Sequence, residues 1–187
     1  MQRAKEIIII GGSAGSYVPI LDILDAVPPT ISQALCFIIH RNPKYESQIE
    51  SSLSARLKRK VIATMDKTPI EPNHIYFAPP GYHMLIEPDL SFSLDTSEPV
   101  NYSRPSIDVL FESAAEIYRK NCTVVLLSGA NNDGSNGIKK VLKFGGKALV
   151  QCPQEAHINT MPGHALRINP AAIALSNEEI ISYFRQL

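Results

Sequence analysis

The stretch "EIIIIGGSAGS", residues 6–16, decides how the rest of the chain is interpreted. It places four consecutive isoleucines directly before Gly-Gly-Ser-Ala-Gly. A short run of β-branched residues closed by glycines predicts a strand over residues 6–10 that is buried on both faces. A helical pattern follows over residues 17–27, with Pro19 in its first turn, where proline is tolerated. Strand, glycine-rich turn and helix together predict the beginning of an α/β fold.

The remaining sequence alternates in the same way between apolar runs and helical patterns. Further strands are predicted at residues 34–39, 61–64, 122–129, 147–151 and 171–174, and further helices at residues 45–59, 106–121, 133–146 and 177–187. This alternation predicts an α/β protein with a doubly wound, mostly parallel sheet and helices on both faces.

Residues 67–95 depart from this alternation. They are rich in proline and contain short extended segments at residues 74–78, 83–87 and 91–94. The last two segments are joined by a tight turn at Pro88-Asp89, which predicts an antiparallel hairpin extension. The composition suits one domain, so we assign residues 1–187 to a single domain.

Composition excludes several classes of protein. The 187 residues contain 18 Lys and Arg against 18 Asp and Glu, and a dedicated nucleic-acid binder would carry a basic excess. The three cysteines lack metal-ligand spacing and predict free thiols in a reducing compartment. No apolar run approaches the roughly 18 residues of a membrane span, and four isoleucines are too few for a signal-peptide core. We therefore expect a cytoplasmic protein with no nucleic-acid partner, no membrane insertion and no metal.

Polar residues follow three of the predicted strands. Ligands of doubly wound sheets bind beyond the carboxyl ends of the strands, where this sequence places Ser13, His40 and Asp133. A serine, a histidine and an aspartate are the set that nucleophilic acyl transfer requires. Residues 11–15 match G-x-S-x-G, the nucleophile elbow, but not the glycine-rich phosphate-binding patterns. The chain order Ser, His, Asp differs from that of the usual α/β-hydrolase, in which the acid precedes the histidine.

Each of these residues also has a structural interpretation. Ser13 could be a helix N-cap, His40 a surface histidine, and Asp133 a turn residue or the N-cap of the helix that follows it. The other histidines are expected to be structural: His74, His83, His157 and His164. His157 or His164 could also pair with an upstream acid, in the order serine, acid, histidine.

Six segments, taken together, resemble one family. They are "IIIIGGSAGS", "FIIHRNP", "IYFAPPGYHM", "SRPSIDVLFESAAEIY", "VVLLSGANNDGSNGI" and "MPGHAL", and they are spread along nearly the whole chain, from residue 7 to residue 166. In this order they resemble the catalytic domain of the chemotaxis receptor methylesterases, the CheB-type protein-glutamate methylesterase/glutaminase family. The resemblance implies a catalytic triad of Ser13, His40 and Asp133 that works without a cofactor.

The sequence departs from the family pattern around this triad. The usual threonine after the serine is Ala14, a usual glycine is Ser16, and Ala130 replaces a methionine thought to help form the oxyanion site. A backbone N–H at Ala130 could still serve there, so we expect altered tuning and not loss of activity. The substrate and oxyanion candidates are Gly12, Ala14, Ala130, Arg104 and Met161.

The resemblance also implies a substrate. The expected enzyme is a serine hydrolase that removes methyl esters from glutamates on the cytoplasmic helical domain of methyl-accepting chemotaxis receptors, with deamidation of receptor glutamines as a second activity. The family often carries a receiver domain, which we do not expect here, so a separate regulatory protein is a further candidate partner. The alternative is a non-catalytic module of the same fold that binds receptors or a small ligand.

Overall fold

The computed structural model describes residues 2–41, 44 and 48–187. Its main sheet has seven strands in the order β3-β4-β2-β1-β7-β8-β9, and every neighbouring pair is parallel. These strands are β1 (Ile7–Gly12), β2 (Ala34–Ile39), β3 (Val61–Ala63), β4 (Ile75–Phe77), β7 (Cys122–Leu126), β8 (Lys147–Gln151) and β9 (Ile173–Leu175). The doubly wound, mostly parallel sheet predicted from the sequence is therefore confirmed.

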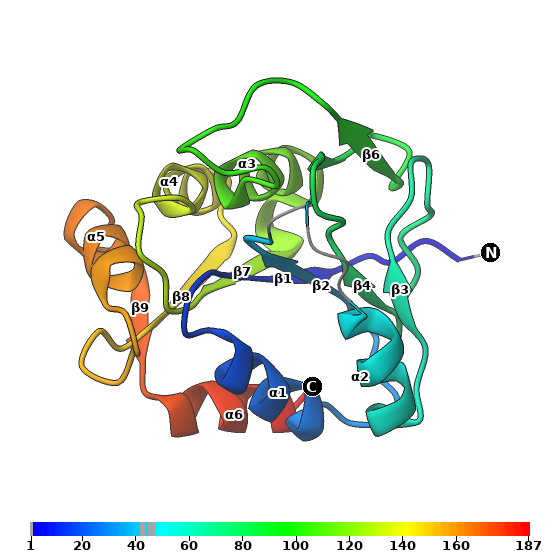
Figure 1. The fold of residues 1–187 in the computed structure, drawn as a ribbon, viewed down its shortest axis with the longest axis horizontal. Coiled ribbons are helices and arrows are strands. Elements are labelled where there is room, and N and C mark those ends of the chain that lie inside the picture. The colour runs from blue at the N-terminus through cyan, green and yellow to red at the C-terminus, as the bar shows by residue number, and fades with distance from the viewer. Residues whose placement is uncertain (1, 42–43, 45–47) are drawn as a thin grey trace.

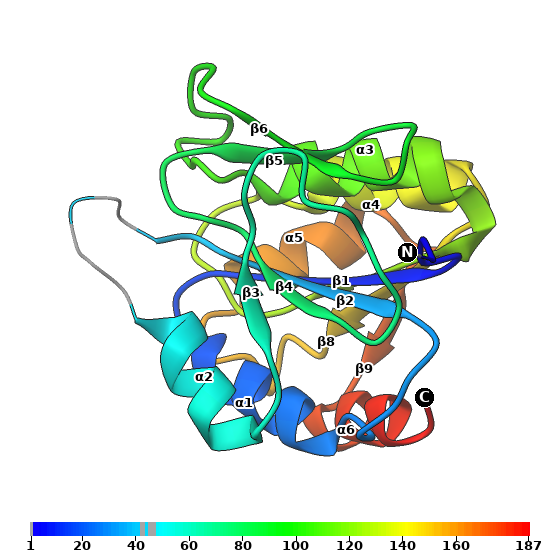
Figure 2. The same ribbon diagram turned by 90° about the vertical axis from the view of Figure 1, so that its right-hand side faces the viewer.

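Helices cover both faces of this sheet, as Figures 1 and 2 show. One face carries α1 (Tyr17–Ala26), α2 (Ile49–Leu57) and α6 (Asn177–Arg185), and the other carries α3 (Ile107–Tyr118), α4 (Ser135–Lys143) and α5 (Thr160–Ile168). The isoleucines of β1 alternate between the two layers: Ile7 and Ile9 join one core cluster, whereas Ile8 and Ile10 join the other. Both faces of β1 are thus fully apolar, as its sequence requires.

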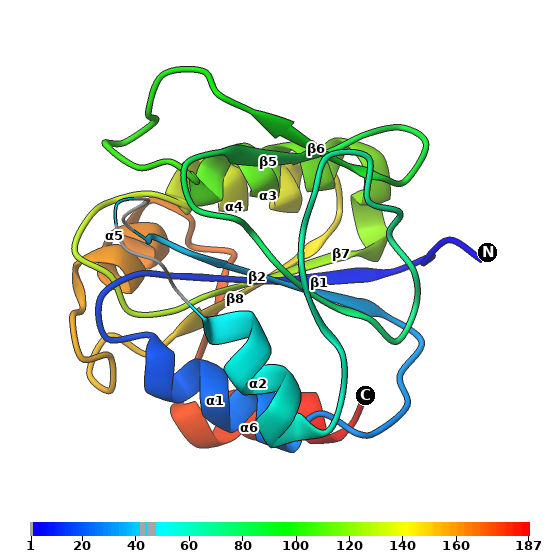
Figure 3. The same ribbon diagram turned by 45° about the vertical axis from the view of Figure 1, so that its right-hand side comes forward.

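The predicted hairpin forms a separate two-stranded antiparallel sheet from β5 (His83–Ile86) and β6 (Phe92–Asp95). It lies over the outer side of α3, as Figure 3 shows. Met84 and Phe92 are fully buried there, and the Ile86 N–H donates to Ser113 Oγ of α3 at 3.1 Å. Because α3 is enclosed between the sheet and the hairpin, its N-terminus is shielded from water.

Several predicted boundaries change. Strand β1 continues through Gly12, because Gly11 and Gly12 still pair with Ile38 and Ile39 of β2. The segment predicted at residues 74–78 forms β4 inside the main sheet, and α5 is a full helix that is missing from the predicted helices. Residues 45–47 of the predicted second helix lie outside the described residues. Over the described part of the chain, none of the helices is long and apolar enough to cross a membrane.

Helices α3 and α4 pack so closely that a glycine is required between them. A Cβ on Gly137 of α4 would lie 2.4 Å from Phe111 Cβ and 3.2 Å from the Asp108 carbonyl oxygen. Gly163 of α5, in contrast, has nothing within 4 Å of such a Cβ. Steric contact with α3 therefore requires a glycine at position 137, whereas no steric contact requires one at position 163.

We predict opposite effects for alanine at these two positions. Gly163→Ala should stabilise the protein by up to about 1 kcal/mol, because alanine is the better helix former. Gly137→Ala should destabilise it by about 1–3 kcal/mol, because the added methyl forces α3 and α4 apart. Urea unfolding of both variants measures the two free energies. Equal effects from the two substitutions would contradict the close α3–α4 packing.

Candidate active site

The site lies where three neighbouring strands end. β2, β1 and β7 are adjacent in the sheet, and the chain continues from β1 to β2 on one side while β7 lies on the other. This reversal of strand order opens a crevice at the carboxyl ends, the usual ligand site of such sheets. His40 follows β2, Ser13 follows β1, and the segment of residues 128–133 follows β7.

The turn that carries Ser13 is held by hydrogen bonds from several sides. The Ser13 N–H donates to the Ser128 carbonyl oxygen at 2.9 Å, and Ser128 Oγ donates to the Ala14 carbonyl oxygen at 2.8 Å. Ser16 Oγ donates to the Ser13 carbonyl oxygen at 2.7 Å. Gly12 is required here, because a Cβ on it would lie 2.5 Å from Ser16 Cβ. The backbone around Ser13 is therefore fixed before any substrate binds.

The Ser13 side chain does not share these bonds. The N-cap of α1 is Ser16, so the interpretation of Ser13 as that cap is wrong. Among the described residues, no partner forms a hydrogen bond with Ser13 Oγ, and the side chain is only half-buried. A hydroxyl on a rigid turn with no structural partner is suited to react with a ligand.

Backbone N–H groups near Ser13 are free to bind an anion. Ala14, Gly15 and Ala130 are exposed, and their N–H groups donate to no acceptor within the described chain. Ala130 is close to Ser13, since a Cβ on the preceding Gly129 would lie 3.1 Å from Ser13 Cβ. Ala14 and Gly15 precede α1, whose N-terminus favours negative charge. These donors are the arrangement expected of an oxyanion site.

The carboxylate of Asp133 is completely buried and accepts hydrogen bonds on both oxygens. Its donors are His40 Nε2, Asn101 Nδ2, Ser106 Oγ and the backbone N–H groups of Ile107, Asp108 and Gly134, at 2.7–3.3 Å. Burial is the largest single influence and pushes its pKa upward. The hydrogen bonds from His40 and from the N–H groups of Asp108 and Ile107 together outweigh burial, so the pKa of Asp133 is lowered.

Asp133 and Asp108 cap each other's helices. Asp133 precedes α4 but binds the first N–H groups of α3, whereas Asp108 of α3 accepts from the Gly137 N–H of α4 at 2.7 Å. Asn101 Nδ2 bridges the two carboxylates, at 3.0 Å from Asp108 Oδ2 and 3.3 Å from Asp133 Oδ1. The prediction that Asp133 caps the helix that follows it is therefore wrong: it caps α3, and Gly134 is the N-cap residue of α4.

Asp108 is the member of this pair whose ionised form is disfavoured. The pKa of Asp108 is raised to about 6, mainly by burial and also by the nearby charges of Asp133 and Glu112, against hydrogen bonds from Gly137 and Asn101. Because the ionised form is disfavoured in the folded protein, Asp108 opposes folding at neutral pH more than it does in acid.

The structure brings His40 to Asp133 but does not join it to Ser13. His40 Nε2 lies 2.9 Å from Asp133 Oδ2, and the His40 side chain is 13% exposed. Its other nitrogen, Nδ1, lies 3.2 Å from Ser103 Oγ. Over the described residues, no hydrogen bond links Ser13 Oγ to the His40 ring. The two segments are joined through the backbone, where the main-chain N–H of His40 donates to the Gly12 carbonyl oxygen at 3.3 Å. Ser103 was not foreseen as a site residue although it begins the family-like segment "SRPSIDVLFESAAEIY", because 63 residues separate it from His40.

Two further candidates are used structurally. Arg104 Nη1 donates to the carbonyl oxygens of Thr96 and Ser97 at 2.6 and 2.8 Å, which anchors that loop. Met161 is fully buried and packs against Gly129, since a Cβ on Gly129 would lie 2.4 Å from Met161 Cε. It therefore supports the loop next to Ser13. A direct role of either residue in substrate binding stays a prediction.

Over the described residues, none of the remaining histidines forms a hydrogen bond with the Ser13 hydroxyl. His83 is buried and holds the segment before α3, through the Glu98 carbonyl oxygen and the Ser106 N–H. His164 Nδ1 lies 3.0 Å from Ser135 Oγ, and His74 Nδ1 lies 2.8 Å from the Pro72 carbonyl oxygen. His157 packs against Gly15, and no hydrogen bond joins it to Ser13 within the described chain.

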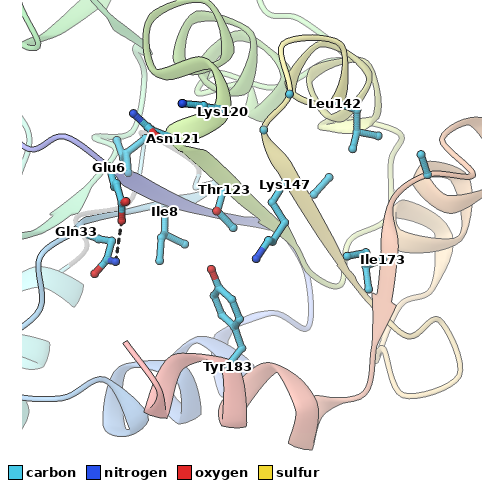
Figure 4. Close-up of a pocket in the computed structure, with 15 residues that line it drawn as sticks. Glu6, Ile8, Gln33, Lys120, Asn121, Thr123, Leu142, Lys147, Ile173 and Tyr183 are labelled. Atoms are coloured by element: carbon cyan, nitrogen blue, oxygen red, sulfur yellow. Dashed lines mark hydrogen bonds between the residues drawn. The ribbon is translucent and has the colours of Figure 1, made fainter.

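Two cavities differ in chemistry. One of about 370 Å³ opens beside His40 and is lined by Arg41, Gly81, Pro99, Tyr102, Ser103 and Arg104. Another of about 480 Å³ lies at the opposite, amino ends of the strands, where Figure 4 shows Lys147 and Tyr183 pointing toward each other. That second cavity is lined by neither serine nor histidine. Within the described residues, no cluster of three His, Cys, Asp or Glu side chains could hold a metal ion. Of these two cavities, the one at the carboxyl edge is therefore the one lined by a base candidate, His40.

Comparison with known proteins links this geometry to one family. The family model described as CheB methylesterase matches residues 8–184. A relative from Leptospira interrogans, provisionally named protein-glutamate methylesterase/protein-glutamine glutaminase, is 38% identical over 97% of this chain and 94% of its own length. A relative from Methanospirillum hungatei with that activity in its name is 29% identical over 97% of this chain and 52% of its own length.

A solved structure agrees with the fold. The Thermotoga maritima CheB methylesterase catalytic domain superimposes with a TM-score of 0.84 at 25% sequence identity. The match covers 100% of this chain and 99% of that domain. The sheet and its covering helices thus correspond along the entire chain.

The buried Asp108 predicts a specific dependence of stability on pH. Its folded pKa of about 6 exceeds its unfolded value of 3.8, so the stability that it contributes is greatest below pH 4 and is lost as pH rises through 6. We expect wild type to lose about 2 kcal/mol relative to Asp108→Asn between pH 4 and pH 7. Denaturant unfolding at several pH values measures this difference.

The exposed Asp22 of α1 provides the control. Asp22→Asn removes one carboxylate from the chain without touching the α3–α4 contact, so its stability relative to wild type should stay level over the same pH range. A level difference for Asp108→Asn as well would contradict the raised pKa of Asp108.

Proposed function

Because the chain belongs to the CheB methylesterase family, we propose that it hydrolyses methyl esters of glutamate side chains on methyl-accepting chemotaxis receptors and releases methanol. One observation supports this most directly: a buried, ionised Asp133 holds His40 beside the rigid turn that presents the free hydroxyl of Ser13. The family assignment favours this enzyme over the non-catalytic binding module.

We assign the first chemical step to Ser13. Its oxygen attacks the ester carbonyl while His40 Nδ1 accepts its proton, since Nε2 is bound to Asp133. The resulting oxyanion is bound by the free N–H groups of Ala14 and Ala130, with Gly15 as a further donor. Collapse of this intermediate breaks the ester C–O bond, and His40 returns the proton to the departing methoxide, which leaves as methanol.

Water completes the cycle. His40 removes a proton from a water molecule that attacks the acyl-enzyme, and the glutamate carboxylate and the Ser13 hydroxyl are regenerated. Asp133 holds the imidazole in one tautomer and stabilises the imidazolium that forms in both steps. The same route on a receptor glutamine releases ammonia, which is the glutaminase activity named for the relatives.

The entrance to the cleft suits a protein substrate. Tyr102 is fully exposed and Tyr82 is 42% exposed, and Tyr102 lines the cavity beside His40. Exposed aromatic side chains supply large contact areas at protein interfaces. We propose that these tyrosines contact the helical cytoplasmic domain of the receptor around the methylated glutamate.

Methanol release from methylated receptor tests the proposed function. Ser13→Ala should lower turnover by at least about 10³-fold, because Ser16, the other serine of this turn, is buried and its hydroxyl donates to the Ser13 carbonyl oxygen. Ser52→Ala, which changes an exposed serine of α2, is the matched control and should keep the wild-type rate. Equal rates for Ser13→Ala and wild type would overturn the assignment of the nucleophile.

The oxyanion assignment predicts different effects for two substitutions at Ala130. Ala130→Pro removes the backbone N–H and should lower turnover by about 10²–10³-fold, the usual cost of one oxyanion donor. Ala130→Met keeps the N–H and should change turnover only modestly, since the residue is exposed. Folding of each variant is checked first by circular dichroism. An unchanged rate in Ala130→Pro would remove this loop from the oxyanion site.

A further inference from the structure

The bond between His40 and Ser103 has a defined direction. Asp133 is acceptor-only when ionised, and its lowered pKa keeps it ionised, so His40 Nε2 carries the hydrogen of the 2.9 Å bond. A neutral imidazole with hydrogen on Nε2 has a lone pair on Nδ1. The contact of 3.2 Å from Ser103 Oγ to Nδ1 is therefore a bond in which the serine hydroxyl donates.

Asn131 fixes the hydroxyl from the other side. Its Oδ1 accepts from the Asp133 N–H at 3.2 Å, which orients the amide so that Nδ2 faces away from Asp133. Nδ2 then donates to the Asn101 carbonyl oxygen at 3.2 Å and to Ser103 Oγ at 3.3 Å. Because Asn131 occupies a lone pair of the Ser103 oxygen, the hydroxyl hydrogen is directed to His40.

We infer that Ser103 is a positioning residue that occupies the base nitrogen of His40, so that His40 must exchange the Ser103 hydroxyl for that of Ser13 before the reaction starts. This inference rests on the proposed triad. The Nδ1 lone pair accepts one good hydrogen bond, and in this structure Ser103 makes it whereas Ser13, within the described residues, does not.

The surroundings of Ser103 do not suit a nucleophile. Its own N–H donates to the Val100 carbonyl oxygen at 2.9 Å and is not available to an oxyanion, in contrast to the free N–H groups around Ser13. The tight turn of residues 100–103 presents it, with positive φ angles of 50° at Asn101 and 62° at Tyr102. Two successive positive φ angles are uncommon for residues other than glycine. The two backbone hydrogen bonds between Val100 and Ser103 hold the turn in this conformation.

The test measures how fast a fluorophosphonate probe labels Ser13 in the free protein, with the labelled peptide identified by mass spectrometry. Ser103→Ala and Ser103→Val remove the hydroxyl and should speed labelling by about two- to tenfold, because one neutral hydrogen bond no longer competes for His40. Ser103→Thr keeps a hydroxyl on a side chain shaped like valine and should label at the wild-type rate. Ser13→Ala should not be labelled. Thermal unfolding of each variant checks that it is folded.

The outcomes separate this inference from the proposed function. Equal rates for the threonine and valine variants, slower labelling of the valine variant, or a label found on Ser103 would each overturn the positioning role. The probe needs no receptor, so faster labelling of Ser103→Val together with an absence of methanol release would retain the inference and contradict the receptor substrate. Absence of labelling in wild type and in every Ser103 variant would overturn the triad and this inference with it.

Discussion

The carboxylate of Asp133, buried at the N-terminus of α3, is the interaction on which the candidate site depends. An isolated buried carboxylate would take up a proton, because burial disfavours its charge. Here the hydrogen bond from His40, together with the N–H groups of Asp108 and Ile107 at the positive end of the helix dipole, keeps it ionised. The hairpin of β5 and β6 covers α3 and excludes water from this contact. The carboxylate that orients His40 therefore also attaches the N-terminus of α3 to the segment that follows β7.

The reciprocal position of Asp108 connects this chemistry to helix packing. Each helix N-terminus receives a carboxylate from the other segment, and Asn101 bridges the two acids, so α3 and α4 hold each other in one register. The two pKa values shift in opposite directions: burial, with a smaller contribution from the charge of Asp133, raises that of Asp108 to about 6, whereas the hydrogen bonds from His40 and from the N–H groups of Asp108 and Ile107 outweigh burial and lower that of Asp133. The acid beside His40 is therefore the one that stays ionised.

Local patterns were sufficient to predict the strands, every helix of the described chain except α5, and the three strand ends that carry Ser13, His40 and Asp133. They act over short stretches, in which burial alternates or repeats along the chain. What they could not predict depends on contacts between distant segments: β4 enters the main sheet, Asp133 caps α3, and Ser103 reaches His40. Arg104 shows the same limit, since its sequence context suits either a substrate contact or the loop anchor that the structure contains.

His40 is bound at both ring nitrogens, and the two bonds differ in strength. The bond to Asp133 is charge-assisted because the carboxylate that accepts it is ionised, whereas in the bond from Ser103 a neutral hydroxyl donates to Nδ1 at 3.2 Å. Charge-assisted hydrogen bonds are roughly twice as strong as neutral ones. When an incoming hydroxyl competes for the imidazole, the Ser103 bond is therefore the one that breaks, and Asp133 keeps the ring in its plane. This difference in strength lets His40 exchange the Ser103 hydroxyl for that of Ser13 at Nδ1 while it keeps its hydrogen bond to Asp133.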